Sequence, residues 1–168
     1  MIKAAQNSYD IIRALDVKSS YSEHKLGLTL YDYAMGLKPE SIIEFGVLNG
    51  YSAVALGLAL KDLGRGHLTC YDLWEKYPYN HGDIKEVQAL IDSLGLTKYV
   101  SLKYGDVYDW SANPESFDLL HVDVSNDGIR LRQILENINR ADIKRGPILF
   151  EGGTRERDKL GWASNGEN

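Results

Sequence analysis

The stretch Ser41-Ile-Ile-Glu-Phe-Gly-Val-Leu-Asn-Gly-Tyr-Ser52 decides the fold that we expect for this chain. Its apolar first half is typical of a buried strand, and Gly46 lets the backbone turn tightly where that strand ends. Gly50 opens the following helix, in which the residues from Ser52 to Leu63 are apolar nearly all round. We therefore predict a strand, a glycine turn and a helix that packs between a sheet and a further layer.

Strand and helix alternate along the rest of the chain. A second strand is expected over residues 67–72, a third over 99–104, a fourth over 117–124 and a fifth over 147–151. Apolar residues recur at helical spacing between these strands. This order predicts an α/β fold with right-handed crossovers and a doubly wound, mainly parallel sheet.

A helical segment precedes the first strand. Ser20-Tyr-Ser-Glu23 has the spacing of a capping box, so we expect a helix to begin there, and an earlier helix is expected over about residues 4–15. Gly36 and Pro39 mark the end of the second of these helices. Its predicted apolar face consists of Leu26, Leu30, Tyr33 and Leu37.

The composition is that of one globular domain, with a helical lead-in over residues 1–38, a core over 40–152 and a tail over 153–168. The net charge of −5 argues against a broad surface for nucleic acid or anionic lipid. The longest apolar run, Ala53–Leu60, is too short to cross a membrane. The single cysteine, Cys70, is interpreted as a buried strand residue, and the lack of a disulfide indicates a reducing compartment and hence the cytoplasm.

Polar residues gather where the predicted strands end, which is where doubly wound sheets bind their ligands. Glu44 lies near the glycine turn and suits a cationic amino-acid head group. Asp72 ends the second strand 22 residues after Gly50, the approximate spacing of an acid that binds two ribose hydroxyls. Asp106 follows the third strand and suits an adenine amino group. Asp72 and Asp106 could instead be cap or turn residues.

A nicotinamide dinucleotide is disfavoured as the ligand. Its binding fingerprint has a second glycine two positions after the first, where the backbone approaches the pyrophosphate closely. Leu48 occupies that position after Gly46, and its bulky side chain opposes such an approach.

Residues 44–52, Glu-Phe-Gly-Val-Leu-Asn-Gly-Tyr-Ser, resemble motif I of the class I S-adenosylmethionine-dependent methyltransferases. The E-x-G-x-x-x-G-Y-S pattern is most similar to the O-methyltransferase branch that contains catechol O-methyltransferase. Phe117-Asp-Leu-Leu-His-Val-Asp123 is similar to the fourth strand of that branch, and Gly146-Pro-Ile-Leu-Phe-Glu151 to its fifth.

This resemblance covers about residues 41–151. It implies that S-adenosylmethionine is the cofactor and that the methyl acceptor is a hydroxyl of a small molecule such as a sugar, a phenol or a natural product. It also implies that the cofactor is bound by Glu44, Gly46, Gly50, Tyr51, Ser52, Asp72 and Asp106.

In the catechol-type branch, an Asp after the fourth strand and an Asp-Asn pair after the fifth hold Mg²⁺, and a lysine acts as the base. This chain offers Asp123 and Glu151 as metal ligands, but Gly152 replaces the Asn and Asn126 replaces the lysine. We therefore expect weak or absent Mg²⁺ dependence. Asp123 and His121, which should share one face of the strand, are the candidate catalytic residues. The alternative for His121 is a histidine satisfied by hydrogen bonds within the sheet.

The loop Trp74-Glu-Lys-Tyr-Pro-Tyr-Asn-His81 is crowded with aromatic residues and follows the predicted ribose-binding position. Two interpretations are open. The loop either closes over the adenosine or the acceptor, or it is a surface loop whose aromatic residues pack on the domain.

Class I methyltransferases usually finish with two further strands, whereas residues 152–168 contain no apolar alternation. We expect that this strand pair is missing or that the chain is a truncated version of a longer one. The fifth strand then becomes a sheet edge, which predicts a homo-oligomer or a tail that folds back as cover. A non-catalytic module that binds S-adenosylmethionine is the alternative function.

Overall fold

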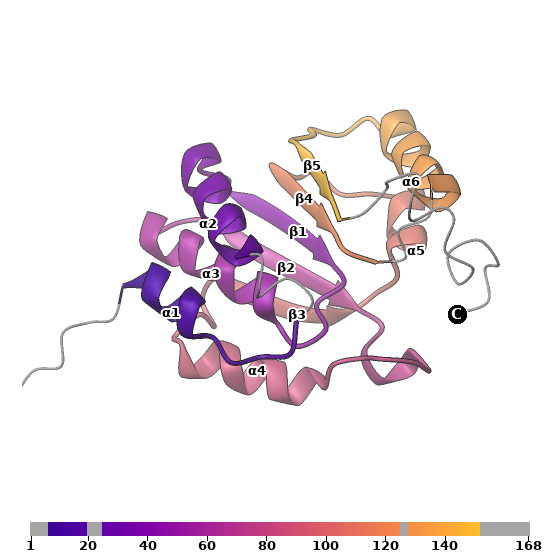
Figure 1. The fold of residues 1–168 in the computed structure, drawn as a ribbon. Coiled ribbons are helices and arrows are strands. Elements are labelled where there is room, and N and C mark those ends of the chain that lie inside the picture. Colours follow the sequence, from indigo (N-terminus) through magenta and orange to yellow (C-terminus); the bar gives the residue numbers. More distant parts are fainter. Residues whose placement is uncertain (1–6, 20–24, 125–127, 152–168) are drawn as a thin grey trace, which may run out of the picture.

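The computed structural model describes residues 7–19, 25–124 and 128–151. Its centre is a parallel sheet of five strands in the order β3-β2-β1-β4-β5 (Figure 1). Strands β2 and β3 lie on one side of β1, and β4 and β5 lie on its other side. This arrangement confirms the predicted α/β fold with a doubly wound parallel sheet. The strands are β1 (Ser41–Phe45), β2 (His67–Asp72), β3 (Val100–Tyr104), β4 (Leu119–Val122) and β5 (Ile148–Phe150).

Helices cover both faces of the sheet (Figure 1). On one face lie α1 (Ser8–Ala14), α2 (Leu26–Leu37), α3 (Tyr51–Leu63) and α4 (Ile84–Ser93), and on the other lie α5 (Val107–Ala112) and α6 (Gly128–Arg140). A single 3-10 turn, η1 (Trp74–Lys76), follows β2. Two apolar cores result, one on each face of the sheet.

The central helix α3 is buried along most of its length, as its apolar sequence predicts. Nine of its thirteen residues are buried, because α2 packs on one side of it and the sheet on the other. Gly50 begins the helix and Gly64 ends it, and both have the left-handed backbone conformation that glycine adopts at low cost. The glycine turn thus leads directly into the most deeply buried helix.

The predicted apolar face of α2 is wrong in half of its members. Tyr33 and Leu37 are exposed, whereas the buried face consists of Gly27, Leu30, Tyr31 and Ala34. The helix is rotated because small residues bring it close to its neighbours. A side chain at Gly27 would meet Ile12 and the Tyr51 ring. Counting large apolar residues could not show this, since a glycine carries no hydrophobic signal.

The capping box at Ser20–Glu23 and the tail over residues 153–168, where a further strand pair would have to lie, fall outside the described residues. Helix α5 was not expected from the sequence, although Asp106 caps it by accepting a hydrogen bond from the amide of Tyr108 at 2.7 Å.

Among the helices that the structure describes, none combines the length and hydrophobicity needed to cross a membrane.

Candidate functional site

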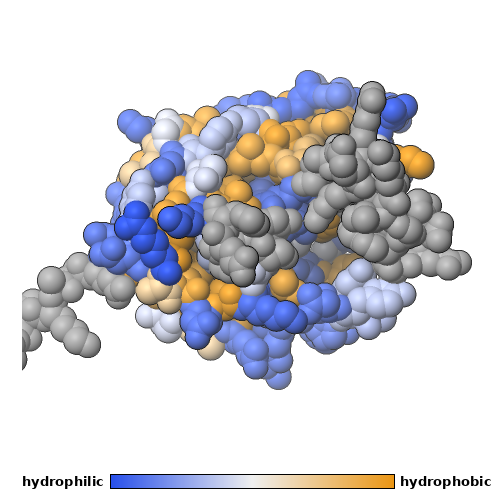
Figure 2. Space-filling model, viewed as in Figure 1, coloured by the Kyte–Doolittle hydropathy of each residue, from blue (hydrophilic) through white to orange (hydrophobic). Residues whose placement is uncertain are grey.

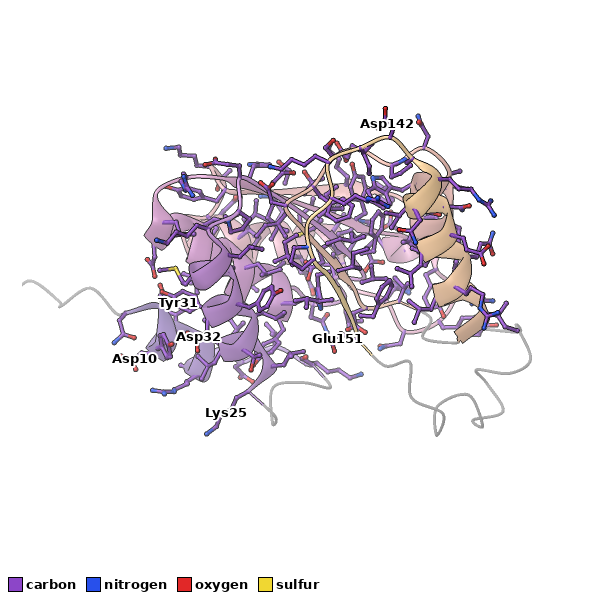
Figure 3. All side chains as sticks on the ribbon, turned by 90° about the horizontal axis from the view of Figure 1, so that it is seen from above. Asp10, Lys25, Tyr31, Asp32, Asp142 and Glu151 are labelled. Carbon is purple, nitrogen blue, oxygen red and sulfur yellow. The ribbon has the colours of Figure 1, made fainter. Side chains whose placement is uncertain are left out.

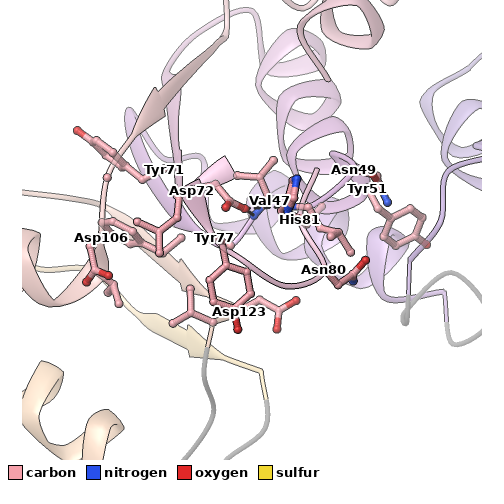
Figure 4. Close-up of a pocket in the computed structure, with 18 of the residues that line it drawn as sticks. Val47, Asn49, Tyr51, Tyr71, Asp72, Tyr77, Asn80, His81, Asp106 and Asp123 are labelled. Atoms are coloured by element: carbon pink, nitrogen blue, oxygen red, sulfur yellow. Dashed lines mark hydrogen bonds between the residues drawn. The ribbon is translucent and has the colours of Figure 1, made fainter. Parts of the chain in front are cut away.

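A cavity of about 770 Å³ opens at the carboxyl ends of β1, β2 and β4 (Figure 4). Its volume lies in the range typical of small-molecule sites. The residues that line it are Lys18, Ser19, Phe45, Gly46, Val47, Leu48, Asn49, Tyr51, Ser52, Tyr71, Asp72, Leu73, Tyr77, Pro78, Asn80, His81, Gly105, Asp106, Val107, Tyr108, Asp123, Val124, Arg130 and Gln133.

Most of the residues predicted to bind a cofactor line this cavity. They are Gly46, Tyr51, Ser52, Asp72 and Asp106, together with the catalytic candidate Asp123. The predicted residues that do not line it are Glu44, Gly50, His121 and Glu151. Gly50 still shapes the site, because it begins α3 and lies against Val87 of α4.

The glycine turn closes tightly against β4. Gly46 has φ +86°, and a Cβ at this position would overlap with the backbone carbonyl of Asp123. Both facts favour glycine, since a larger residue would be strained and would push the ends of β1 and β4 apart. Leu48 also has a positive φ, of 49°. The turn therefore holds a backbone conformation that other loop interactions must stabilise.

Asp72 supplies that stabilisation. Its Oδ2 accepts hydrogen bonds from the amides of Val47 at 2.7 Å and Leu48 at 3.1 Å, and its Oδ1 accepts one from the amide of Trp74 at 2.9 Å. The residue predicted to bind ribose thus lines the cavity and also ties the end of β2 to the glycine turn. Such charge-assisted bonds to backbone amides are stronger than neutral ones.

Asp106 and Tyr51 also line the cavity and make a hydrogen bond that stabilises the fold. Asp106 caps α5 through Tyr108, as described above, which is the alternative role considered for it. The phenol oxygen of Tyr51 accepts a hydrogen bond from the amide of Gly27 at 3.3 Å and so links α3 to α2. Figure 4 shows Asp106 and Tyr51 at opposite ends of the cavity.

Glu44 is placed differently from the prediction. Its side chain is fully buried and does not line the cavity. The parallel register sets Glu44 opposite both Cys70 of β2 and His121 of β4. The Cys70 thiol donates a hydrogen bond to Glu44 Oε2 at 3.1 Å, and His121 Nδ1 lies 2.9 Å from Oε1. Glu44 is therefore part of a buried polar row and is not among the residues that line the cavity.

His121 lies between two carboxylates in this row. Its Nε2 is 3.0 Å from Oε1 of Glu151, which stands at the carboxyl end of β5 (Figure 3). Burial by itself lowers the pKa of His121, but the hydrogen bonds and charges of Glu151 and Glu44 outweigh it and raise the pKa to about 10. Since both ring nitrogens are bonded to carboxylates, the geometry supports a histidine satisfied within the sheet and offers no lone pair for a general base.

The side chains of the two metal candidates have different surroundings. Asp123 lines the cavity, whereas Glu151 is turned toward His121. In residues 7–19, 25–124 and 128–151, no three acidic, histidine or cysteine side chains form a cluster that could hold a metal ion. Asn126 and Gly152 fall outside the described residues.

The aromatic loop after β2 divides into a buried and a cavity-lining part. Trp74 is fully buried, and its indole Nε1 donates a hydrogen bond to the carbonyl of Lys103 at 3.0 Å. Tyr77, Pro78, Asn80 and His81 line the cavity. A Cβ at the next residue, Gly82, would overlap with the carbonyl of Leu48, so the loop packs directly on the glycine turn.

Sequence reasoning missed the cavity residues that come from elements without a motif. These are Lys18, Ser19, Tyr108, Arg130 and Gln133. The spacing of Arg130 and Gln133, three residues apart on α6, places them on one helical face, but the same spacing occurs on any solvated helix. The packing of α6 against α5 and the sheet brings them to the site.

Comparison with known proteins identifies the family. The profile of a family described as methyltransferase domain matches residues 43–151. The chain belongs to this family. The match begins within β1 and ends directly after β5, so it includes the glycine turn, Asp72, Asp106 and the buried polar row. No curated protein matches the sequence.

Solved structures of methyltransferases share the fold. The structure of a Podospora anserina methyltransferase bound to S-adenosylhomocysteine is 22% identical, with a TM-score of 0.60 over 86% of this chain and 59% of that chain. A Bacillus cereus O-methyltransferase in complex with S-adenosylhomocysteine is 19% identical, with a TM-score of 0.51 over 77% of this chain and 66% of that chain. The present chain thus spans about three fifths to two thirds of the length of these methyltransferases.

The buried row gives a prediction about stability. In His121→Gln the carboxylates of Glu44 and Glu151 lose a cationic partner, and breaking a buried pair in this way should lower the free energy of unfolding by about 3 kcal/mol. Because the pKa of His121 is raised above its ordinary value of 6.5, this contribution is present below pH 6.5 and is lost as the pH rises through about 10. Urea unfolding at several pH values measures both effects.

His67→Gln is the matched control, since His67 is an exposed histidine at the amino end of β2. This substitution should change the free energy of unfolding little. Adding Glu44→Gln to His121→Gln should recover part of the loss, because it removes one uncompensated buried charge. A His121→Gln protein as stable as the control would contradict the stabilising role of the row.

Proposed function

We propose that this chain binds S-adenosylmethionine and transfers its methyl group to a hydroxyl of a small molecule, with a sugar, a phenol or a natural product as the acceptor. One observation carries the proposal. In a chain of the methyltransferase domain family, the glycine turn from Gly46 to Asn49, the start of α3 at Tyr51 and Ser52, and the acids Asp72 and Asp106 all line one cavity at the carboxyl ends of the strands.

The cavity fits the adenosine part of this cofactor. Asp72 Oδ1 accepts one backbone amide in the structure, and a carboxylate oxygen has room for a second donor such as a ribose hydroxyl. Asp106 uses Oδ1 for the helix cap, which leaves Oδ2 for an adenine amino group. Both acids lie on the cavity surface, where their remaining acceptor capacity faces the ligand space.

The amino-acid part of the cofactor requires a different partner from the one predicted. Because Glu44 is buried in the row with Cys70 and His121, it cannot hold the head group directly. The amides of the first turn of α3, at Tyr51 and Ser52, have no partner within the helix and favour a carboxylate. Asp123, on the cavity surface, is the acid that suits the ammonium group.

The chemical demand on the protein is small. When bound, the sulfonium supplies an already activated methyl group, so the chain has to align an acceptor, exclude water and receive a proton. The glycine turn and the loop over residues 77–82 confine the cavity from two sides. The net charge of −5 supports a small-molecule acceptor over a nucleic acid.

Binding of the cofactor tests the proposal. Asp72→Ala removes both the ribose acceptor and the anchor of the glycine turn, so the affinity for S-adenosylhomocysteine should fall by roughly 10- to 100-fold. Asp72→Asn, which keeps an acceptor oxygen for the loop amides, should lose less. Isothermal titration calorimetry measures these affinities. Binding of NAD but not of S-adenosylmethionine by the wild-type chain would sink the proposal.

We propose that the activity does not depend on Mg²⁺. Glu151 is engaged by His121, and Gly152 and Asn126 depart from the catechol-type pattern. Methyl transfer to a panel of phenols and sugars should therefore continue at the same rate in EDTA. Loss of activity on chelation, with recovery on adding Mg²⁺ alone, would show that Asp123 and Glu151 do hold a metal.

We also propose that the chain self-associates in the cytoplasm through β5. In the part of the chain that the structure describes, β5 pairs with β4 only, and its residues Ile148, Leu149 and Phe150 are half-buried. Figure 2 shows apolar surface over the part of this face where β4 and β5 lie. The single, buried Cys70 supports a reducing compartment.

Light scattering should then report a dimer or larger assembly, and the amides of residues 148–150 should exchange slowly with solvent. Hydrogen exchange on the wild-type protein is preferred to a substitution, because Leu149→Lys would place a charge against the core. A monomer whose β5 amides exchange rapidly would refute self-association.

A further inference from the structure

His81 is a cavity residue of the aromatic loop that follows β2. It belongs to the loop between η1 and α4, lines the cavity and is itself solvent-exposed. Its neighbour Gly82 packs on the carbonyl of Leu48, which places His81 beside the glycine turn. Figure 4 shows His81 between Asp72 and Val47 on one side and Asn49 and Tyr51 on the other.

The hydrogen bond of His81 fixes its tautomer. Nδ1 lies 2.7 Å from the backbone carbonyl oxygen of Tyr79. A carbonyl can only accept, so Nδ1 carries a proton, and the Nδ1–H tautomer of the ring has its lone pair on Nε2. In residues 7–19, 25–124 and 128–151, no group forms a hydrogen bond with Nε2. A neutral imidazole held through Nδ1 by a backbone carbonyl is the form that accepts a proton at Nε2.

The other histidines of the described chain cannot take this role. His121 has both nitrogens bonded to buried carboxylates. His67 stands at the amino end of β2, opposite the cavity, and bonds to Ser101. The cavity acids have other partners in the proposed function, since Asp72 and Asp106 bind the adenosine part of the cofactor and Asp123 its ammonium group. His81 is thus the histidine that combines a place on the cavity with an accepting nitrogen.

The position of His81 agrees with where the methyl group has to lie. The sulfur of S-adenosylmethionine joins the ribose to the amino-acid chain. With the ribose at Asp72 and the carboxylate at the first turn of α3, the sulfur lies between these two points. The glycine turn connects them, and the loop that carries His81 packs on this turn.

We propose that His81 is the general base that receives the proton of the acceptor hydroxyl, an inference that rests on the proposed methyl transfer. As an oxygen lone pair of the acceptor forms the bond to the methyl carbon, the carbon–sulfur bond breaks and its electron pair stays on sulfur, which becomes a neutral thioether. The hydroxyl proton passes to Nε2 of His81. The resulting imidazolium then releases its proton to solvent, to which the ring is exposed.

A first experiment needs no acceptor. Protein labelled with ¹⁵N-histidine is studied by NMR with and without S-adenosylhomocysteine, and His67→Asn and His81→Asn assign the signals. We expect the Nδ1–H tautomer for His81 and a change in its ring signals when S-adenosylhomocysteine binds, with those of His67 unchanged. An Nε2–H tautomer, or His81 signals that do not respond to bound S-adenosylhomocysteine, would overturn the proposal.

A second experiment measures turnover. His81→Asn keeps a donor for the Tyr79 carbonyl but cannot accept a proton, so kcat should fall by roughly 100-fold or more while the affinity for S-adenosylhomocysteine stays the same. His67→Asn is the control and should match the wild type. The assay follows S-adenosylhomocysteine formation with a panel of phenols and sugars.

The outcomes separate the two proposals. If the wild type binds no S-adenosylhomocysteine, the proposed function fails, and the role of His81 fails with it. If His81→Asn binds S-adenosylhomocysteine and transfers methyl at the wild-type rate, only the role of His81 is overturned. If no member of the panel is methylated, the NMR result on tautomer and response decides.

Discussion

The buried histidine between two carboxylates is the constraint on which the ligand-binding end of the sheet depends. Glu44, His121 and Glu151 come from β1, β4 and the end of β5, so their two short contacts fix the carboxyl ends of three neighbouring strands. The charged row is buried, and removing its central cation would leave two carboxylates without compensation. The same strand ends carry Gly46 and Asp123, whose close approach shapes the cavity floor. The polar row thus supports the strand ends that form the site, although none of its residues lines the cavity.

Asp72 makes a second connection across the site. A carboxylate at the end of β2 binds two amides of the glycine turn and one of the following loop, so it organises the backbone on both of its sides. Binding a ribose hydroxyl with the same side chain would add a ligand to a group that is already held in place. A preorganised acceptor of this kind loses little conformational freedom when the ligand arrives.

Much of the fold could be predicted from the sequence because its signals are local. The run of apolar residues in α3, the alternation of strand and helix, and the glycines at 46, 50 and 64 each report on a neighbourhood of a few residues. The cavity positions of Asp72 and Asp106 could also be predicted, because both residues stand at the ends of strands and parallel strands end on one edge of the sheet. The rotation of α2 was missed because Gly27 and Ala34 form its contact face without contributing a hydrophobic signal.

The direction of the Glu44 side chain could not be predicted for a different reason. It depends on the strand order, which sets Cys70 and His121 on either side of Glu44. Glu44 is therefore buried between neighbouring strands, although it lies only two residues before Gly46 of the ligand-binding turn. The role of His81 was hidden in the same way, since its tautomer depends on the fold of its own loop and its place depends on the contact between Gly82 and Leu48.

The contact between Gly82 and Leu48 has a consequence for how such a site can change over evolution. Two loops that touch backbone to backbone cannot drift independently, so an insertion or a bulky residue in one has to be matched in the other. New acceptor preferences would then arise more readily where Arg130 and Gln133 of α6 line the cavity. Side chains on a helix surface can be exchanged one at a time. Substitutions are therefore constrained at the Gly82–Leu48 contact and tolerated on α6.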